Sequence, residues 1–204
     1  MLAQYFTSAL SAFTNDTFLI ENYWKEITAQ YSKKKRHYHN LTHLGHLLQQ
    51  LLAVKDKIEN MPVVILATAY HDVIYDPLKK DNEEKSAALA KERLTAINFA
   101  PSGIEKCVAM ILATKSHQSS ADSDTNYFTD ADLSVLGSAP GPYKEYSLHI
   151  RKEYSIYPDI IYKPGRKKVL QHFLSMERIF KTAHFYDKYE EQARRNMKDE
   201  WKEL

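Results

Sequence analysis

The residues with the clearest chemical potential are histidines and aspartates in three separate segments of the chain. Residues 38–46 contain three histidines, His71 and Asp72 are adjacent, and Asp130 and Asp132 follow much later. A neutral imidazole nitrogen and a carboxylate oxygen are both ligands for divalent transition metals. The three segments therefore indicate a candidate metal site built from side chains that are distant in sequence.

The pair His71-Asp72 lies in the most apolar stretch of the sequence, which predicts a central buried helix over Val63–Tyr75. An ionised carboxylate buried there is costly unless it is paired or binds a metal. Adjacent helical residues point about 100° apart, so both side chains can reach one ion only if it lies beyond the helix end. The structural alternative is that His71 caps the helix and Asp72 pairs with a buried arginine.

The histidines of the first segment differ in their predicted position relative to a helix over residues 41–58. Asn40 is the predicted N-cap, because its side chain can accept hydrogen bonds from the amides of the first turn. His43 falls at the margin of a leucine stripe and can face the interior, whereas His46 points toward solvent. His39 precedes the cap and can reach over the helix start. We therefore expect His43 near a buried site and His46 on the surface.

The two later aspartates fall in the segment Thr129-Asp130-Ala131-Asp132, which looks like a capping box before a short helix that ends at Gly137. The helix dipole stabilises carboxylates in a first turn, which would explain both aspartates without any ligand. The alternative is that one of them binds a buried ion, and their spacing does not choose between them.

The rest of the sequence predicts an all-α fold in a single domain, residues 1–204. Apolar residues make up 44% of the chain, and its 5 Gly and 7 Pro are too few for the many turns of a β-sandwich or barrel. The single cysteine, Cys107, excludes a disulfide framework and a cysteine-based zinc site. Helical spacing of apolar residues predicts helices over 2–13, 16–31, 41–58, 63–75, 83–98, 102–115, 143–154, 166–182 and 187–203, with a polar loop over 116–126.

Charge and hydropathy limit the partners of the chain. Its net charge of +2 is too small to indicate nucleic-acid binding, and the basic run at residues 33–36 is expected to be a solvated helix end. The longest apolar stretch, Val63 to Tyr70, is much shorter than the roughly 20 residues of a membrane span. Residues 1–10 lack the basic region and apolar core of a secretory signal. We expect a cytoplasmic protein that binds neither nucleic acid nor a membrane.

The order His, His-Asp, Asp on a helical scaffold resembles the HD superfamily of metal-dependent phosphohydrolases. The resemblance implies that His43, His71, Asp72 and Asp132 are the ligands of a divalent ion, and it selects Asp132 over Asp130. Segments similar to one predicted bacterial branch of that superfamily are HNLTH (39–43), HDVIYDP (71–77), DNEEKSA (81–87), TDADLSVLG (129–137), IRKEY (150–154) and YKPGR (162–166).

The HNLTH segment is also similar to cyclic-nucleotide phosphodiesterases, in which the first histidine protonates the leaving oxygen and the second binds metal. This likeness implies that His39 is the general acid and His43 a ligand. The superfamily fold implies an HD-type helical bundle with a motif-bearing core over about residues 36–137. Helices over residues 143–203 would pack on that core.

The implied activity is hydrolysis of a small phosphate ester, with nucleotides among the candidates, by attack of a metal-bound water. The enzyme would be a phosphomonoesterase or phosphodiesterase using one Mn, Fe, Co, Ni, Zn or Mg ion. His39 and Asp72 would be catalytic, and Glu83, or Glu84 beside it, would orient the water or a ligand. Phosphate oxygens also need nearby donors, best a bidentate arginine. The candidates, each of which a surface position would also explain, are Arg36, Lys115, His117, Arg151, Arg166 and Arg195.

Two other functions are compatible with the same ligands. A non-catalytic module would use them for metal-dependent ligand binding, although an intact ligand set argues for catalysis. A di-iron oxygenase needs further histidines between Asp72 and Asp132, where the sequence has only His117.

Overall fold

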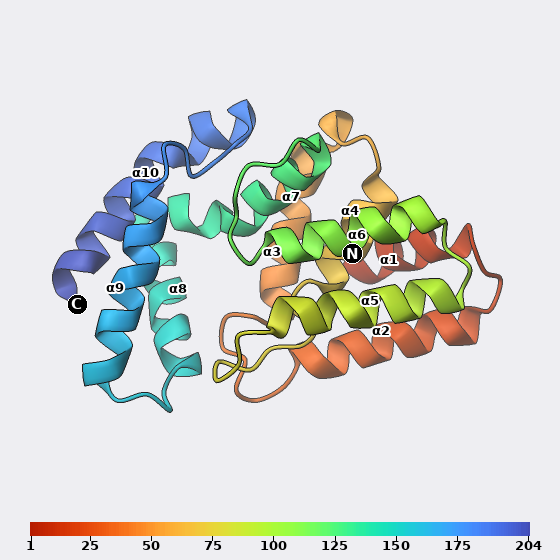
Figure 1. Cartoon of the computed structure of the whole chain (residues 1–204), viewed down its shortest axis with the longest axis horizontal. Helices are drawn as coiled ribbons and strands as arrows, with labels where there is room; N and C mark the ends of the chain where they lie inside the picture. The colour runs from red at the N-terminus through yellow and green to blue at the C-terminus, as the bar shows by residue number, and fades with distance from the viewer. The chain divides into compact units, whose positions relative to one another are not determined.

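The computed structural model describes residues 1–204 and is entirely helical (Figure 1). Ten α-helices and two short 3-10 helices follow one another, and no strand is present, so the predicted all-α fold class is confirmed. The chain divides into two compact units, an N-terminal unit over Met1–Thr129 and a C-terminal unit over Asp130–Leu204. The sequence predicted a single domain with its motif-bearing core over 36–137. The boundary between the two units falls at 129/130, and the N-terminal unit includes the first two helices.

The N-terminal unit is organised around one helix, α4, which contacts four of its neighbours. Every residue of α4 from Val63 to Tyr70 is buried, as the continuous apolar stretch predicts. Asn60 caps its first turn, and Pro62 occupies an early position where the lost amide costs nothing. The helices of this unit are α1 (Leu2–Ser11), α2 (Thr17–Tyr31), α3 (Leu41–Ala53), η1 (Lys55–Lys57), α4 (Met61–Tyr70), α5 (Asn82–Ala96), α6 (Pro101–Ala113) and most of α7 (Ser123–Leu133).

Helix α4 ends at Tyr70, five residues before the predicted end at Tyr75. The backbone beyond it is held by side chains from elsewhere in the unit. The guanidinium of Arg36 donates to the carbonyls of Asp72 and Val73, at 2.6 and 2.9 Å. The amide of Ile74 donates to the hydroxyl of Ser86 at 3.1 Å. These long-range hydrogen bonds replace the next helical turn, and a local apolar pattern does not contain them.

Helix α7 corrects the predicted loop over 116–126 and the predicted capping box. It begins at Ser123, where the Asp122 carboxylate accepts from the amide and hydroxyl of Thr125 at 2.8 and 2.6 Å. Asp130 and Asp132 consequently lie in the last turns of a helix and not in a first turn. The helix dipole disfavours carboxylates there, so it no longer explains either aspartate.

The C-terminal unit is held together by buried ionic and polar contacts. Arg166 donates to both carboxylate oxygens of Glu200, at 2.7 and 2.9 Å, and the Tyr143 hydroxyl donates to the same carboxylate. Its elements are the end of α7, η2 (Ser134–Gly137), α8 (Pro140–Glu153), α9 (Asp159–Ser175) and α10 (Ala183–Glu203).

Helix α9 starts seven residues before the predicted boundary at 166 and contains Pro164. None of the helices in either unit combines the length and apolarity needed to cross a bilayer.

Candidate metal centre

His71 lies at the C-cap of α4 with only 1% of its surface exposed. Its Nδ1 is 2.9 Å from the carbonyl oxygen of Thr68. A carbonyl can only accept, so this contact assigns a proton to Nδ1, and in the neutral ring the lone pair is then on Nε2. A hydrogen bond of this kind fixes the tautomer and ring direction of metal-binding histidines. His71 is therefore presented as an Nε2 ligand.

His43, in the first turn of α3, brings a second imidazole to the same point. It is buried, and its Nε2 lies 3.2 Å from Nε2 of His71. The Asn40 side chain accepts from the amides of Thr42 and His43, so the predicted N-cap is confirmed. His46, one turn further along α3, is exposed, as its helical position predicts. The predicted cap thus fixes the start of the helix whose interior histidine faces His71.

Asp72 adds a carboxylate beside the two imidazoles. Its Oδ2 is 3.1 Å from Nε2 of His71 and 4.0 Å from Nε2 of His39. The Asp72 side chain is 17% exposed, so solvent can reach this edge of the cluster. Its backbone amide donates to the hydroxyl of Tyr31 at 3.0 Å, which anchors the turn that carries the carboxylate. Nε2 of His71 thus lies close both to Nε2 of His43 and to an accessible carboxylate oxygen of Asp72.

The ring of His39 is held by aromatic neighbours. It stacks on Tyr75 with ring centroids 4.3 Å apart, and the Tyr38 ring packs edgewise at 5.0 Å. About a fifth of the His39 side chain is exposed (20%). The ring therefore has a fixed direction beside the Asp72 carboxylate while remaining accessible to solvent.

Arg36 connects the two histidine segments, a role that the sequence analysis did not predict. Its guanidinium donates to the carbonyl of His39 at 3.3 Å as well as to those of Asp72 and Val73. It also lies over the rings of Tyr31 and Tyr75, 4.8 and 5.5 Å from their centroids. The predicted phosphate ligand is thus used to position the backbone of the site, and no sequence motif marks its partners.

The C-terminal unit distinguishes the two candidate aspartates. Asp130 is fully buried and accepts from the amides of Lys181 and Thr182 and from the Thr182 hydroxyl, at 2.9, 2.8 and 2.7 Å. Both of its carboxylate oxygens therefore stabilise the turn before α10. Asp132 is partly exposed in the last turn of α7. Of the two, Asp132 is the candidate ligand, which agrees with the choice made from family resemblance.

Most of the predicted substrate-binding cations have partners that stabilise the fold. Arg151 binds Asp159 through Nε and Nη2, at 3.1 and 2.8 Å, and donates to two backbone carbonyls. Arg166 is buried against Glu200 in the pair described above. Arg195 pairs with Glu191 on the surface of α10. The structure thus gives these three arginines intramolecular functions.

The remaining predicted residues surround the start of α5 and the end of α6. Lys115 forms an exposed ion pair with Glu84, which raises the pKa of Lys115 and lowers the pKa of Glu84. Glu83 is half-buried in the first turn of α5. His117 follows α6 with a φ of 53°, in the left-handed region that ends helices.

No protein-family model, no curated protein and no solved structure matches this chain. The resemblance to the HD superfamily therefore stays a prediction from the sequence segments, and the chemistry of the site has to be argued from its own geometry.

Proposed function

We propose that this chain is a divalent-metal-dependent phosphohydrolase that acts on a small phosphate ester. The observation that carries the proposal is the pair of buried imidazoles whose Nε2 atoms face each other at 3.2 Å, beside the Asp72 carboxylate. Imidazole nitrogens and carboxylate oxygens are the kinds of ligand that bind divalent transition metals. His43 and His71, together with Asp132, form a group of side chains that could hold a metal ion.

The continuity of α7 supports Asp132 as the carboxylate ligand. Phe128, on the same helix, packs its ring against His71 in a T-shaped arrangement at 5.8 Å. Asp132 follows Phe128 by four residues, and residues four apart share a helix face. Asp132 therefore follows Phe128 by one turn on the same helix.

A divalent ion bound to these ligands would supply Lewis acidity and lower the pKa of a water at neutral pH. Asp72, the accessible carboxylate, orients that water or contributes a further ligand atom. His39 donates a proton to the leaving oxygen, an effect that is typically worth about 10²–10⁴ in rate. Arg36 is a positioning residue, because its guanidinium holds the backbone of both His39 and Asp72.

Lys115 is the predicted cation that we retain for binding the phosphate. Its ion pair with Glu84 is exposed, with 45% and 48% of the two side chains accessible. Solvent screens an exposed pair of this kind and leaves it weak, so a phosphate can replace the glutamate at little cost. Arg166, by contrast, cannot leave Glu200 without leaving a buried charge.

The metal content of matched histidine variants tests the proposed centre. We expect the purified protein to bind a stoichiometric divalent ion, His43→Ala and Asp132→Ala to lose it, and His46→Ala to keep it. Asp130→Asn provides a second control, because that residue stabilises a turn. Stoichiometric metal in His43→Ala would contradict the assignment of the ligands.

A panel of phosphate esters, assayed with Mn, Mg, Co and Ni in turn, tests the activity. Turnover that disappears in His43→Ala and survives in His46→Ala supports the proposal. Metal binding without turnover of any ester would indicate a metal-dependent ligand-binding module. Bound iron with oxygen consumption would indicate an oxygenase.

A further inference from the structure

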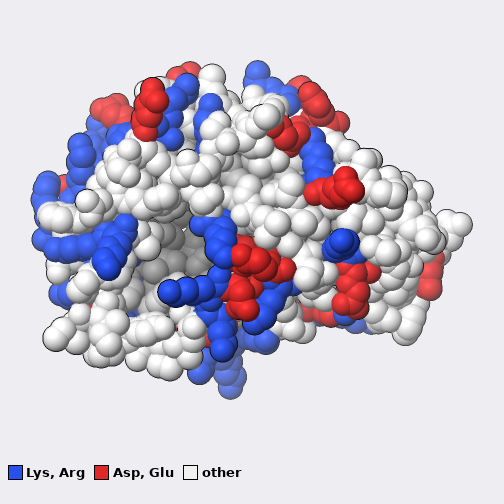
Figure 2. All heavy atoms as spheres, in the orientation of Figure 1, with Lys and Arg blue, Asp and Glu red and all other residues white.

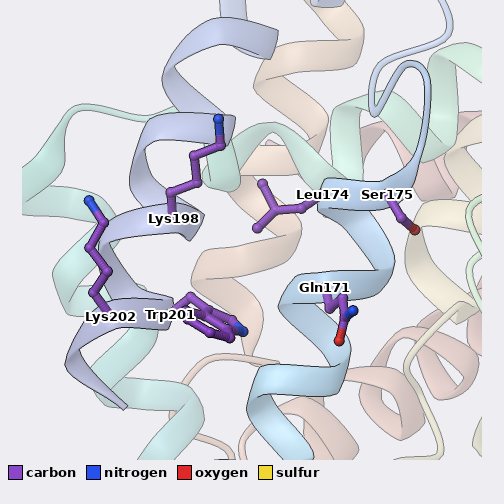
Figure 3. A pocket seen from close by; sticks show the side chains of 6 residues that line it. All are labelled: Gln171, Leu174, Ser175, Lys198, Trp201 and Lys202. Atoms are coloured by element: carbon purple, nitrogen blue, oxygen red, sulfur yellow. The ribbon is translucent and has the colours of Figure 1, made fainter.

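The C-terminal unit contains a second feature suited to ligand binding, a groove between α9 and α10 (Figure 3). Its volume is about 470 Å³. Small-molecule sites typically have volumes of about 300–1,000 Å³. It shares no residue with the proposed metal centre, so it is independent of the proposed function. The groove is lined by Gln171, Leu174, Ser175, Lys198, Trp201 and Lys202.

The groove follows from helical spacing on both of its walls. Residues 171, 174 and 175 are three and four apart on α9, and residues 198, 201 and 202 are spaced in the same way on α10. Such residues share one helix face. Leu174 and Trp201 extend from opposite helices into the space between them (Figure 3). Trp201 leaves 44% of its surface exposed, so the groove presents a large apolar and aromatic wall to solvent.

The charged residues that line the groove are both lysines. No acidic residue lines the groove, whereas Lys198 and Lys202 do. The ammonium of Lys167 lies over the Trp201 ring, 4.5 Å from its centroid. Lys202 pairs with Asp199 at 2.9 Å in an exposed contact, and Lys198 makes no ion pair. Figure 2 shows Lys and Arg side chains gathered over α9 and α10, at the left of the view.

We propose that this groove binds a small amphiphilic anion, with an apolar body and one carboxylate. The apolar body would lie against Leu174 and Trp201, and the carboxylate would meet the ammonium of Lys198. The lysine rim complements a negative head group and repels a positive one. Six lining residues match the size of a small ligand better than the extended contact strip of a bound peptide helix.

Octanoate is a suitable probe, and Trp201 is a built-in reporter. The chain has only two tryptophans, so a Trp24→Phe background isolates the fluorescence of Trp201. Trp24 lies in the N-terminal unit against Phe6, where a phenylalanine retains the aromatic contact. We expect a saturable fluorescence change with octanoate, and at least about fivefold weaker binding of octylammonium, because the latter places like charges together. Octanol should bind with intermediate affinity.

Variants of Lys198 and Leu174 test separately the contact with the carboxylate and the contact with the apolar body. Lys198→Gln should weaken octanoate binding by about two- to fivefold, the range expected for one exposed ion pair, and leave octanol unchanged. Leu174→Ala should weaken both ligands. Lys168→Gln, an exposed lysine of α9 outside the groove, is the matched control.

Three outcomes with the small probes would overturn the proposal. The first is a fluorescence change that does not saturate, and the second is equal affinity for octanoate and octylammonium. The third is octanoate binding that is unchanged in both Lys198→Gln and Leu174→Ala. Saturable binding of an acidic amphipathic peptide without binding of octanoate would identify a peptide groove instead, and would equally contradict the small-ligand assignment.

Discussion

The two units bury polar side chains in opposite ways. In the C-terminal unit, Glu200 meets complementary donors from Arg166 and Tyr143. In the N-terminal unit, the Nε2 atoms of His43 and His71 lie 3.2 Å apart, and the Asp72 carboxylate lies 3.1 Å from Nε2 of His71. The first arrangement is complete within the protein. The second brings together side chains of the types that bind divalent metals, and this difference separates a scaffold from a candidate site.

The charge state of the C-terminal cluster agrees with its role in the scaffold. Burial alone favours the neutral form of Glu200, but the guanidinium of Arg166 and the Tyr143 hydroxyl outweigh it and lower the pKa of Glu200. The same cluster raises the pKa of Tyr143, mainly through burial and the nearby Glu200 charge. The carboxylate is therefore held ionised and the phenol neutral, which leaves nothing in this cluster to exchange protons at neutral pH.

The largest expected effect concerns His39, the residue that we propose protonates the leaving oxygen. His39→Ala should retain the metal and lose about 10²–10⁴ in kcat on an ester with a poor leaving group. On a nitrophenyl ester, whose leaving oxygen needs little protonation, the loss should be far smaller. His46→Ala should change neither rate. If His39→Ala loses the same factor in kcat on both esters, His39 is not the general acid.

Glu200→Ala tests the scaffold side of the comparison. Removing this carboxylate leaves the Arg166 guanidinium buried without its partner, which typically costs about 3–5 kcal/mol. Urea denaturation followed by circular dichroism measures the loss. The control is Glu191→Ala, whose carboxylate pairs with Arg195 while 84% exposed and should change stability by at most about 0.5 kcal/mol. Equal effects of the two substitutions would show that the buried pair does not hold this unit.

The stability that the Arg166–Glu200 pair contributes should depend on pH in one direction. Because the pKa of Glu200 is lowered on folding, its contribution is fully present above its unfolded pKa of about 4.3. The contribution is lost as the pH falls through the lowered value. The stability difference between the unsubstituted protein and Glu200→Ala should therefore be constant from pH 5 to 8 and narrow below about pH 4.

Removal of the metal tests the candidate site through its effect on the stability of the fold. An ion that binds only the folded chain, at about a thousandfold above its Kd, adds about 4 kcal/mol. For a chain of this length that is on the order of 10 °C in Tm. A chelator should lower Tm by that amount at pH 7.5, and the added metal should restore it. At pH 5 the effect should fade, because protonated imidazoles do not bind metal and an ordinary histidine has a pKa of about 6.5.

The sequence predicted the elements of the site better than their long-range partners. Periodicity placed His43 inside and His46 outside, because a leucine stripe defines the buried face of α3. The continuous apolar stretch likewise predicted the burial of α4. In contrast, Arg36 reaches carbonyls 36 and 37 residues away, and Arg166 reaches Glu200 across 34 residues. Such pairings depend on the tertiary fold, and no local spacing encodes them.

The predicted start of α7 was wrong for a related reason. The contact between Asp122 and Thr125 that caps the start of α7 lies within a polar segment. Because that polarity indicated a loop, the cap was not predicted. The same error placed Asp130 and Asp132 in a first turn. With the correct boundary, the carboxylate of Asp130 is explained by the turn at Lys181 and Thr182. The revised boundary strengthens the ligand assignment, because it removes the helix dipole as an alternative explanation for Asp132.

The smallest expected effect concerns Arg151, which sequence reasoning offered for the substrate and the structure gives to the scaffold. Its guanidinium binds the exposed Asp159 carboxylate and the carbonyls of Tyr154 and Tyr157. With 32% and 63% of the two charged side chains accessible, this pair is screened by solvent. Arg151→Met should therefore lower stability by no more than about 1 kcal/mol and leave kcat/KM for a phosphate ester unchanged. Lys115→Met, measured beside it, should raise KM. If Arg151→Met reduces kcat/KM tenfold while its urea midpoint stays unchanged, this arginine serves the substrate, and the distinction drawn here between site and scaffold fails at that residue.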